Sequence, residues 1–208
     1  MAPAAPCRIV AAIKGNDMTH PPDETLASRL DRIESTLAIQ QLPVRYALAV
    51  DGRDIETWLS LFVPDVDCGR HGIGREALRG TIEPALRGFY RSIHFICGHH
   101  IEFADPDHAH GHVYCRAEHE DGAQWIVMAI CYFDEYARRD GTWYFVRRRE
   151  RHWYAVDTLD RPSPPFHRWP GHDIPPKLPA AFPTWAAFWD SSDPAEIGRR
   201  TGEIDRGQ

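Results

Sequence analysis

The segment RYALAVDGRD, residues 45–54, ends a run of helical character in an acid, Asp51, which is followed by Gly52. A carboxylate at the C-terminal end of a helix faces the negative end of the helix dipole, which disfavours its charge. The residues themselves allow two interpretations. Asp51 is either a solvated loop acid, since Asp-Gly pairs are common after helices, or an acid kept at this place for chemistry.

Histidines form a second group with chemical potential. The segment HAHGHVYCRAEHE, residues 108–120, has His108, His110 and His112 at alternate positions, hence on one face of a strand. An His-X-His pair can bind a metal ion from one strand, as it does in cupins. His110, His112 and Glu118 do not have the tighter cupin spacing, however, and the first two histidines fall near a turn. A metal site is therefore the weaker alternative, and we predict none.

Composition limits the classes of protein and partner. The 208 residues are 43% hydrophobic, which fits one domain with a full core and terminal tails. The formal net charge of -6 implies no basic face, so nucleic acid is not an expected partner. No apolar run approaches the roughly 20 residues of a membrane helix, so no membrane partner is expected either.

The N-terminus and the cysteines bear on location. The segment MAPAAPCRIVAAIKGNDM lacks the basic start and long apolar core of a secretion signal, and Met18 is a candidate natural start. The five cysteines are scattered and never form a CxxC pair. We therefore predict a cytoplasmic protein without a disulfide framework.

Three helical segments come first along the chain. From Thr25 the apolar residues Leu26, Leu30, Ile33 and Leu37 recur at helical spacing, and the pattern continues to Ala49, with Pro43 expected to kink or split the helix. A shorter helix is predicted within DIETWLSLF, residues 54–62. A third, interrupted by Pro84, is predicted within residues 74–90.

Four strand-like segments follow, at residues 92–105, 108–120, 123–139 and 142–157. They are separated by the turn DPDH and by two Asp-Gly pairs, which are strong hairpin signals. Consecutive antiparallel strands after helices predict an α+β fold in which N-terminal helices pack on one face of a curved, mainly antiparallel sheet.

The C-terminal part has a different composition. Residues 160–183 hold eight of the 17 prolines, together with several aromatic residues. Proline excludes a helix or a central strand here, and a disordered linker seldom contains so many aromatic residues. We expect a disordered tail at residues 1–24, a domain at residues 25–158, and an extended arm at residues 159–208 that packs on the domain or on a neighbouring subunit.

A helix that ends in RYALAVDGRDIETWLSLFVPD, followed by a sheet whose first strand carries SIHF, resembles the SnoaL-like branch of the nuclear transport factor 2-like superfamily. The resemblance covers about residues 26–157 and is nearest to the cofactor-free lyases, which include scytalone dehydratase, bile-acid 7α-dehydratase and hexachlorocyclohexane dehydrochlorinase. It implies a cone-shaped α+β barrel, open at one end, that holds a small hydrophobic substrate without a metal or organic cofactor. It also implies a homo-oligomer, commonly a trimer, with a dimer as the alternative.

The resemblance also implies site residues. The family's helix-end Asp matches Asp51, and its strand His matches His94 in SIHF. The polar residue five positions before the Asp is Tyr46, and the Arg of the last strand matches Arg148. A further polar group on the second strand is expected within residues 114–118.

One departure concerns the residue directly before the Asp. Scytalone dehydratase has a Tyr there, whereas this chain has Val50. Its water-activating tyrosine arrangement is therefore not expected.

Such an arrangement predicts proton abstraction. Asp51 accepts the N–H of the His94 imidazole, fixes its tautomer and stabilises the imidazolium once His94 has taken a proton. Tyr46 and Arg148 would hold a carbonyl, an enolate or a leaving group. Outside the resemblance, His94 and Tyr46 can equally be core residues, and Arg148 can lie on a solvated sheet edge.

Alternation along the strands limits which residues share a face. Arg148, Glu150 and His152 share one face of the last strand, and His100 and Glu102 have the parity of His94. The expected cone lining consists of apolar and aromatic side chains: Trp58, Phe62, Phe89, Trp125, Met128 and Tyr132.

The leading functional hypothesis is a cofactor-independent lyase of the dehydratase type, acting on a small, apolar, cyclic or polyketide-like hydroxy-carbonyl compound. An isomerase or cyclase using the same dyad is the nearest alternative. A non-catalytic ligand-binding or assembly domain, like the β subunit of ring-hydroxylating dioxygenases, is the alternative from another class, and it predicts an occluded cone or no contact between Asp51 and His94.

Overall fold

A computed structural model describes residues 25–160, 165–182, 186 and 190 of the chain. The tail predicted for residues 1–24 and most of the arm after residue 182 lie outside the described residues. Every named helix and strand belongs to one compact unit that ends at Lys177, and the following description concerns this unit.

Helices occupy the first part of the unit. They are α2 (Leu26–Asp51), α3 (Ile55–Ser60) and α4 (Arg75–Leu86), with the short 3-10 helix η1 (Gly69–His71) before α4. The side chain of Thr25 caps α2, and that of Asp54 caps α3. Pro43 lies inside α2 without splitting it, and Pro84 lies near the end of α4.

Four antiparallel strands follow in the order β1-β2-β3-β4. Their bounds are Ser92–Phe103, His108–Asp121, Gln124–Arg139 and Thr142–Asp157. The loop between β3 and β4 consists of Asp140 and Gly141, both with positive φ, which is the backbone of a tight hairpin turn of the kind that Asp-Gly predicts. The predicted α+β class, with N-terminal helices packed on a curved antiparallel sheet, is confirmed.

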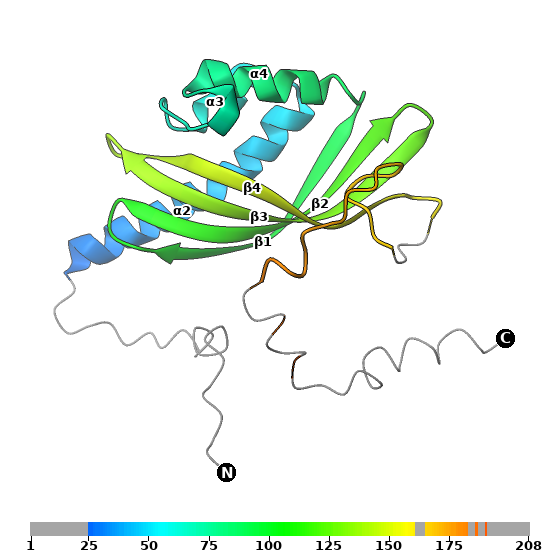
Figure 1. The fold of residues 1–208 in the computed structure, drawn as a ribbon. Coiled ribbons are helices and arrows are strands. Elements are labelled where there is room, and N and C mark those ends of the chain that lie inside the picture. Colours follow the sequence, from blue (N-terminus) through cyan, green and yellow to red (C-terminus); the bar gives the residue numbers. More distant parts are fainter. Residues whose placement is uncertain (1–24, 161–164, 183–185, 187–189, 191–208) are drawn as a thin grey trace, which may run out of the picture. The chain divides into compact units, whose positions relative to one another are not determined.

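The sheet curves around the C-terminal half of α2, which packs against both edge strands, β1 and β4 (Figure 1). Buried side chains of α2 and α3 meet the inner face of the sheet at Tyr136 and Phe145. A second cluster on β2, β3 and β4 includes Val113, Met128 and Ile130. The helices therefore fill one end of the concave face, and the other end is available for a cavity.

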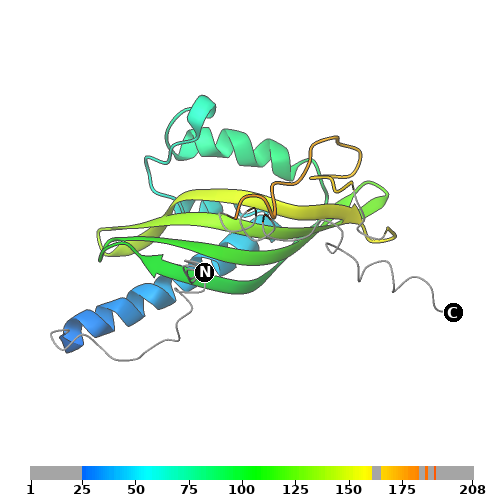
Figure 2. The same cartoon turned by 60° about the horizontal axis from the view of Figure 1, so that its bottom comes forward.

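The first apolar stripe of α2 is not part of this core. Leu26, Leu30, Ile33 and Leu37 are each more than half exposed, because the N-terminal half of α2 extends past the end of the sheet (Figure 2). The buried residues of α2 begin at Ser35 and are concentrated toward the C-terminal end.

A bulge interrupts β1 between Ile96 and His99. It adds a residue on one strand and therefore reverses the alternation of inward and outward side chains. His94 faces inward before the bulge, whereas His100 and Glu102, after it, face outward and are exposed. The expectation that His100 and Glu102 share the face of His94 is therefore wrong.

In the described part of the chain, no helix is long and apolar enough to span a membrane. The four cysteines of these residues, Cys68, Cys97, Cys115 and Cys131, are free thiols. Cys7 lies outside the described residues.

The close approach of β1 and β2 generates a prediction about stability. A Cβ on Gly111 would collide with the backbone carbonyl oxygen of His100 and crowd the ring of Tyr136. Because a backbone atom cannot move aside, we expect Gly111→Ala to lower the free energy of unfolding by about 1–3 kcal/mol.

Urea unfolding followed by circular dichroism measures this effect. Gly98→Ala, on β1, is the control because a Cβ there meets no atom within 4 Å, and we expect a change below about 0.5 kcal/mol. Equal effects of the two substitutions would contradict the close approach at Gly111.

Candidate active site

The acid at the end of α2 contacts the histidine near the start of β1. His94 Nδ1 lies 2.7 Å from Asp51 Oδ1, and the backbone N–H of His94 donates to Asp51 Oδ2 at 2.8 Å. The carboxylate therefore binds both the ring and the backbone of one residue, which fixes the position and the orientation of the imidazole.

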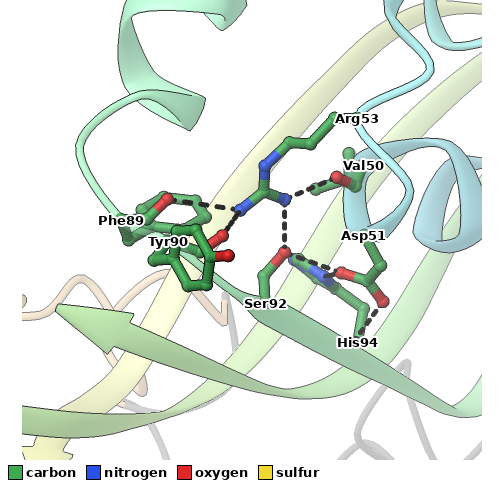
Figure 3. A network of polar contacts seen from close by, with 7 residues as sticks. All are labelled: Val50, Asp51, Arg53, Phe89, Tyr90, Ser92 and His94. Carbon is green, nitrogen blue, oxygen red and sulfur yellow. Dashed lines mark hydrogen bonds and ion pairs between the residues drawn. The ribbon is translucent and has the colours of Figure 1, made fainter.

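Arg53 compensates for the unfavourable place of Asp51 (Figure 3). Its Nη1 donates to the carbonyl of Val50 at 2.7 Å and to Ser92 Oγ at 2.9 Å, and Ser92 Oγ donates in turn to Asp51 Oδ1 at 2.8 Å. Its Nη2 donates to the carbonyls of Phe89 and Tyr90. One cation thus satisfies a carbonyl at the helix end and joins this end to the segment that enters β1.

These contacts decide the ionisation of Asp51. Burial by itself would raise the pKa of the carboxyl group, but the hydrogen bonds and charge of His94, with the hydrogen bond from Ser92, bring it below its ordinary value. A carboxylate at Oδ1 requires a proton on His94 Nδ1, so Nε2 of the neutral ring carries the lone pair. We infer this tautomer from the hydrogen bonds.

A cavity of about 350 Å³ lies beside His94, within the size range of small-molecule sites. Its apolar walls come from α2, α4, β3 and the segment after β4. Its polar side chains are Tyr46, His94, His119, Tyr132, Glu150, His152, Arg168 and His172.

Three of the six apolar and aromatic residues expected to line the cone lie at this cavity. Phe89, Met128 and Tyr132 line the cavity, whereas Trp58 and Phe62 do not. These two rings are buried behind Tyr46, with the Trp58 ring 5.8 Å from that of Tyr46, so they belong to the core under the cavity.

Trp125 does not line the cavity either. It alternates with the inward residues of β3, and its Nε1 donates to Glu118 Oε2 at 2.8 Å. Odd-numbered residues of β3 point to the face opposite to that of Met128 and Tyr132. The alternation of side chains along the strand therefore argues against Trp125 as a lining residue.

Tyr46 lines the cavity as a neutral phenol. Burial raises the pKa of its hydroxyl group to about 12, although the charge of Arg148 lowers it in part. At neutral pH Tyr46 is therefore a hydrogen-bond donor toward the cavity.

Arg148 faces inward but does not line the cavity. Its Nε and Nη2 donate to Asp134 at 2.9 and 2.8 Å, and its guanidinium carbon lies 4.4 Å from the centre of the Tyr46 ring and 4.0 Å from that of Tyr132. The guanidinium is thus held behind the two tyrosines, where it supports their rings. This geometry gives Arg148 no direct contact with a ligand.

The polar group of the second strand is His119, one residue beyond the predicted range. Its ring stands edge-on to His94, with centroids 5.6 Å apart, and packs between Phe89 and Trp169. Burial and the neighbouring charge of His94 lower the pKa of His119 to about 4, so the ring is neutral. The pairing of His94 with Ala117 was the missing information, since it identifies the inward positions of β2.

Glu150 and His152 enter the cavity from β4. Oε1 of Glu150 lies 2.5 Å from Nε2 of His152, and both residues share the inward face that alternation predicted. The sequence alone predicts no role for them, because an acid and a histidine two positions apart on a strand are not a motif by themselves.

The first part of the proline-rich segment packs against the barrel. The backbone N–H of Ala155 donates to the carbonyl of His167 at 3.1 Å, and Trp169 contacts His119. Arg168, His172 and Ile174 complete the cavity wall. No pattern in the sequence indicated that these residues reach the site.

The three alternating histidines of β2 do not converge on one site. His108 contacts Asp105 at 3.0 Å, His110 contacts Glu102 at 2.7 Å, and the ring of His112 packs on Phe133. Each therefore has a separate neighbour on the outer face of the sheet.

Comparisons with known proteins agree on one family. A family model described as a SnoaL-like domain matches residues 31–149, more than half of the chain. The γ-hexachlorocyclohexane dehydrochlorinase of Sphingobium indicum is 33% identical over 128 residues, which covers 58% of this chain and 82% of that protein. Hexachlorocyclohexane dehydrochlorinase 1 of the same species is 32% identical over 123 residues.

Solved structures give the same result. The crystal structure of LinA superimposes with a TM-score of 0.56 at 30% identity and covers 66% of this chain and 99% of that one. A protein from Novosphingobium aromaticivorans described as a scytalone dehydratase has a TM-score of 0.56 at 24% identity, with 64% of this chain and 93% of that chain covered. The second comparison supports the fold alone.

The ionised state of Asp51 generates a prediction. Because its pKa is lower in the folded than in the unfolded chain, its ionisation stabilises the fold above the unfolded pKa, and this stabilisation is lost as the pH falls through the folded pKa. We expect Asp51→Asn to unfold at lower urea concentration than the wild type near pH 7, and the difference to shrink below about pH 4.

The exposed acid Asp65 supplies the control, since Asp65→Asn should alter the unfolding curve little at any pH. If the Asp51→Asn difference stayed constant from about pH 7 to pH 3, Asp51 would not be held as a carboxylate.

Proposed function

The chain belongs to the SnoaL-like domain family, and on this basis we propose that it is a cofactor-independent lyase of the dehydratase type. Its substrate is a small, apolar, cyclic or polyketide-like compound with a hydroxyl and a carbonyl group. The observation that supports this proposal most directly is the contact of 2.7 Å between Asp51 and His94 at the wall of a cavity with both apolar and polar side chains.

Relatives at about one-third identity are named as dehydrochlorinases, enzymes that eliminate a leaving group. Elimination next to a carbonyl needs a base for the α-proton and donors for the oxygen that becomes negative. His94 Nε2 takes the α-proton, and Asp51 stabilises the imidazolium that forms. The imidazolium then gives this proton to the leaving hydroxyl group, which departs as water while the C–C double bond forms. Such a positioned base contributes about 10²–10⁴-fold in rate.

Neutral donors suit the developing enolate. Tyr46 is a protonated phenol, and His119 is a neutral imidazole beside the base. In a cavity that excludes water, such donors stabilise a developing negative charge more strongly than they would in solution. Arg148 contributes indirectly, because its guanidinium group packs on the rings of Tyr46 and Tyr132 and holds them in place.

The alternative functions, a non-catalytic domain and an isomerase or cyclase, make different predictions for the geometry of the site. A non-catalytic domain predicts a plugged cone or separated Asp51 and His94 side chains, and neither feature is present in the described residues. An isomerase or cyclase uses the same proton abstraction and differs in the product. The homo-oligomer and the cytoplasmic location stay predictions.

The first test of the proposal is substitution of the base. We expect His94→Ala to lower turnover of hydroxylated ring ketones by about 10²–10⁴-fold, and Asp51→Asn to lower it substantially because the imidazole loses its orientation. Loss of water from the substrate, followed by mass spectrometry, measures turnover.

His100→Ala is the matched control, since His100 is on the same strand but faces outward. It should retain wild-type turnover, and circular dichroism should report a folded protein for all three variants. Wild-type turnover by His94→Ala would remove the dyad mechanism.

A further inference from the structure

The cavity holds a carboxylate that the dyad does not use. The side chain of Glu150 lines the cavity on β4 and is 38% exposed, whereas that of its partner His152 is 4% exposed. In the dyad only the histidine lines the cavity, with a side chain that is 7% exposed, whereas Asp51, whose side chain is 25% exposed, lies outside it. On β4 both members of the pair line the cavity, so the carboxylate of Glu150 can contact a ligand directly.

The surroundings keep Glu150 ionised. Burial alone would raise its pKa, but the contact with His152 and the positive charge of Arg168 lower it. The contact with His152 uses Oε1, so Oε2 is available to accept a hydrogen bond from a ligand in the cavity.

An ionised oxygen in the wall of the cavity constrains the ligand. When a ligand displaces the cavity water, Oε2 loses its hydrogen bonds unless the ligand replaces them. A C–H or C–Cl group cannot donate a hydrogen bond, whereas a hydroxyl group can. A site built to bind a hydroxyl group therefore rejects an analogue of the same shape that lacks it.

We propose that Glu150 is a specificity-determining residue that selects ligands with a hydroxyl group directed at β4 and rejects halogenated or unsubstituted rings of the same shape. The inference rests on the proposed function in that the cavity is taken as the substrate site. It narrows the substrate class, because it sets this chain apart from relatives named for a chlorinated hydrocarbon.

The test measures binding without turnover. The probes are 4-hydroxycyclohexanone and 4-chlorocyclohexanone, whose substituents are too far from the carbonyl group for the proposed elimination, titrated by ligand-observed NMR. We expect the wild type to bind the hydroxy ketone at least ~10-fold more tightly than the chloro ketone. In Glu150→Leu the ratio should fall to within ~3-fold of unity.

Two further variants control for indirect effects. Glu150→Gln keeps the size of the side chain and a hydrogen-bond acceptor. It should therefore fold even if Glu150→Leu does not fold, and it should retain part of the preference for the hydroxy ketone. Glu102→Leu removes the other Glu–His pair, with His110, on the outer face of the sheet, and should bind both probes as the wild type does.

Each outcome decides the proposal. Equal wild-type affinity for the two probes, no detectable binding of the hydroxy ketone, or an unchanged ratio in both Glu150 variants would overturn it. His94→Ala separates this proposal from the lyase mechanism, since it should abolish turnover but keep the preference. If His94→Ala kept both wild-type turnover and the preference for the hydroxy ketone, the lyase mechanism would be rejected and the role of Glu150 would stand.

Discussion

The site depends on the hydrogen bonds by which one carboxylate joins the end of a helix to the first strand of the sheet. Asp51 binds the ring and the backbone N–H of His94, and Ser92 gives it a third donor. Arg53 then supplies the positive charge that the end of α2 lacks. An acid that the helix dipole would destabilise thus becomes a well-satisfied carboxylate, and the imidazole beside it has one orientation.

The rest of the unit gives this pair its surroundings. The sheet curves around α2, so that its concave face is filled by helices at one end and open at the other. Behind the cavity, the ion pair of Arg148 and Asp134 is enclosed by aromatic rings, and it holds Tyr46 and Tyr132 against the cavity. A buried pair of this kind gives a defined geometry more reliably than it gives stability.

The sequence predicted the fold well because its signals are local. Asp-Gly pairs mark the turns that join β2, β3 and β4, and the family motif at Asp51 identifies the helix end that meets β1. It predicted the site less completely. The bulge in β1 reversed the faces of His100 and Glu102, and the pairing that brings His119 to His94 depends on contacts between strands. Residues 168–174 reach the cavity only through tertiary packing, for which the sequence has no pattern.

The central claim is that Asp51 holds the His94 imidazole as a base directed at a carbon acid. Proton exchange at the α-carbon of 4-hydroxycyclohexanone in D₂O, followed by NMR, tests it without any assumption about the leaving group. The account predicts exchange catalysed by the wild type, slowed in Asp51→Asn and reduced to the uncatalysed rate in His94→Ala. Exchange at the wild-type rate in His94→Ala, or no catalysed exchange by the wild type, would contradict it.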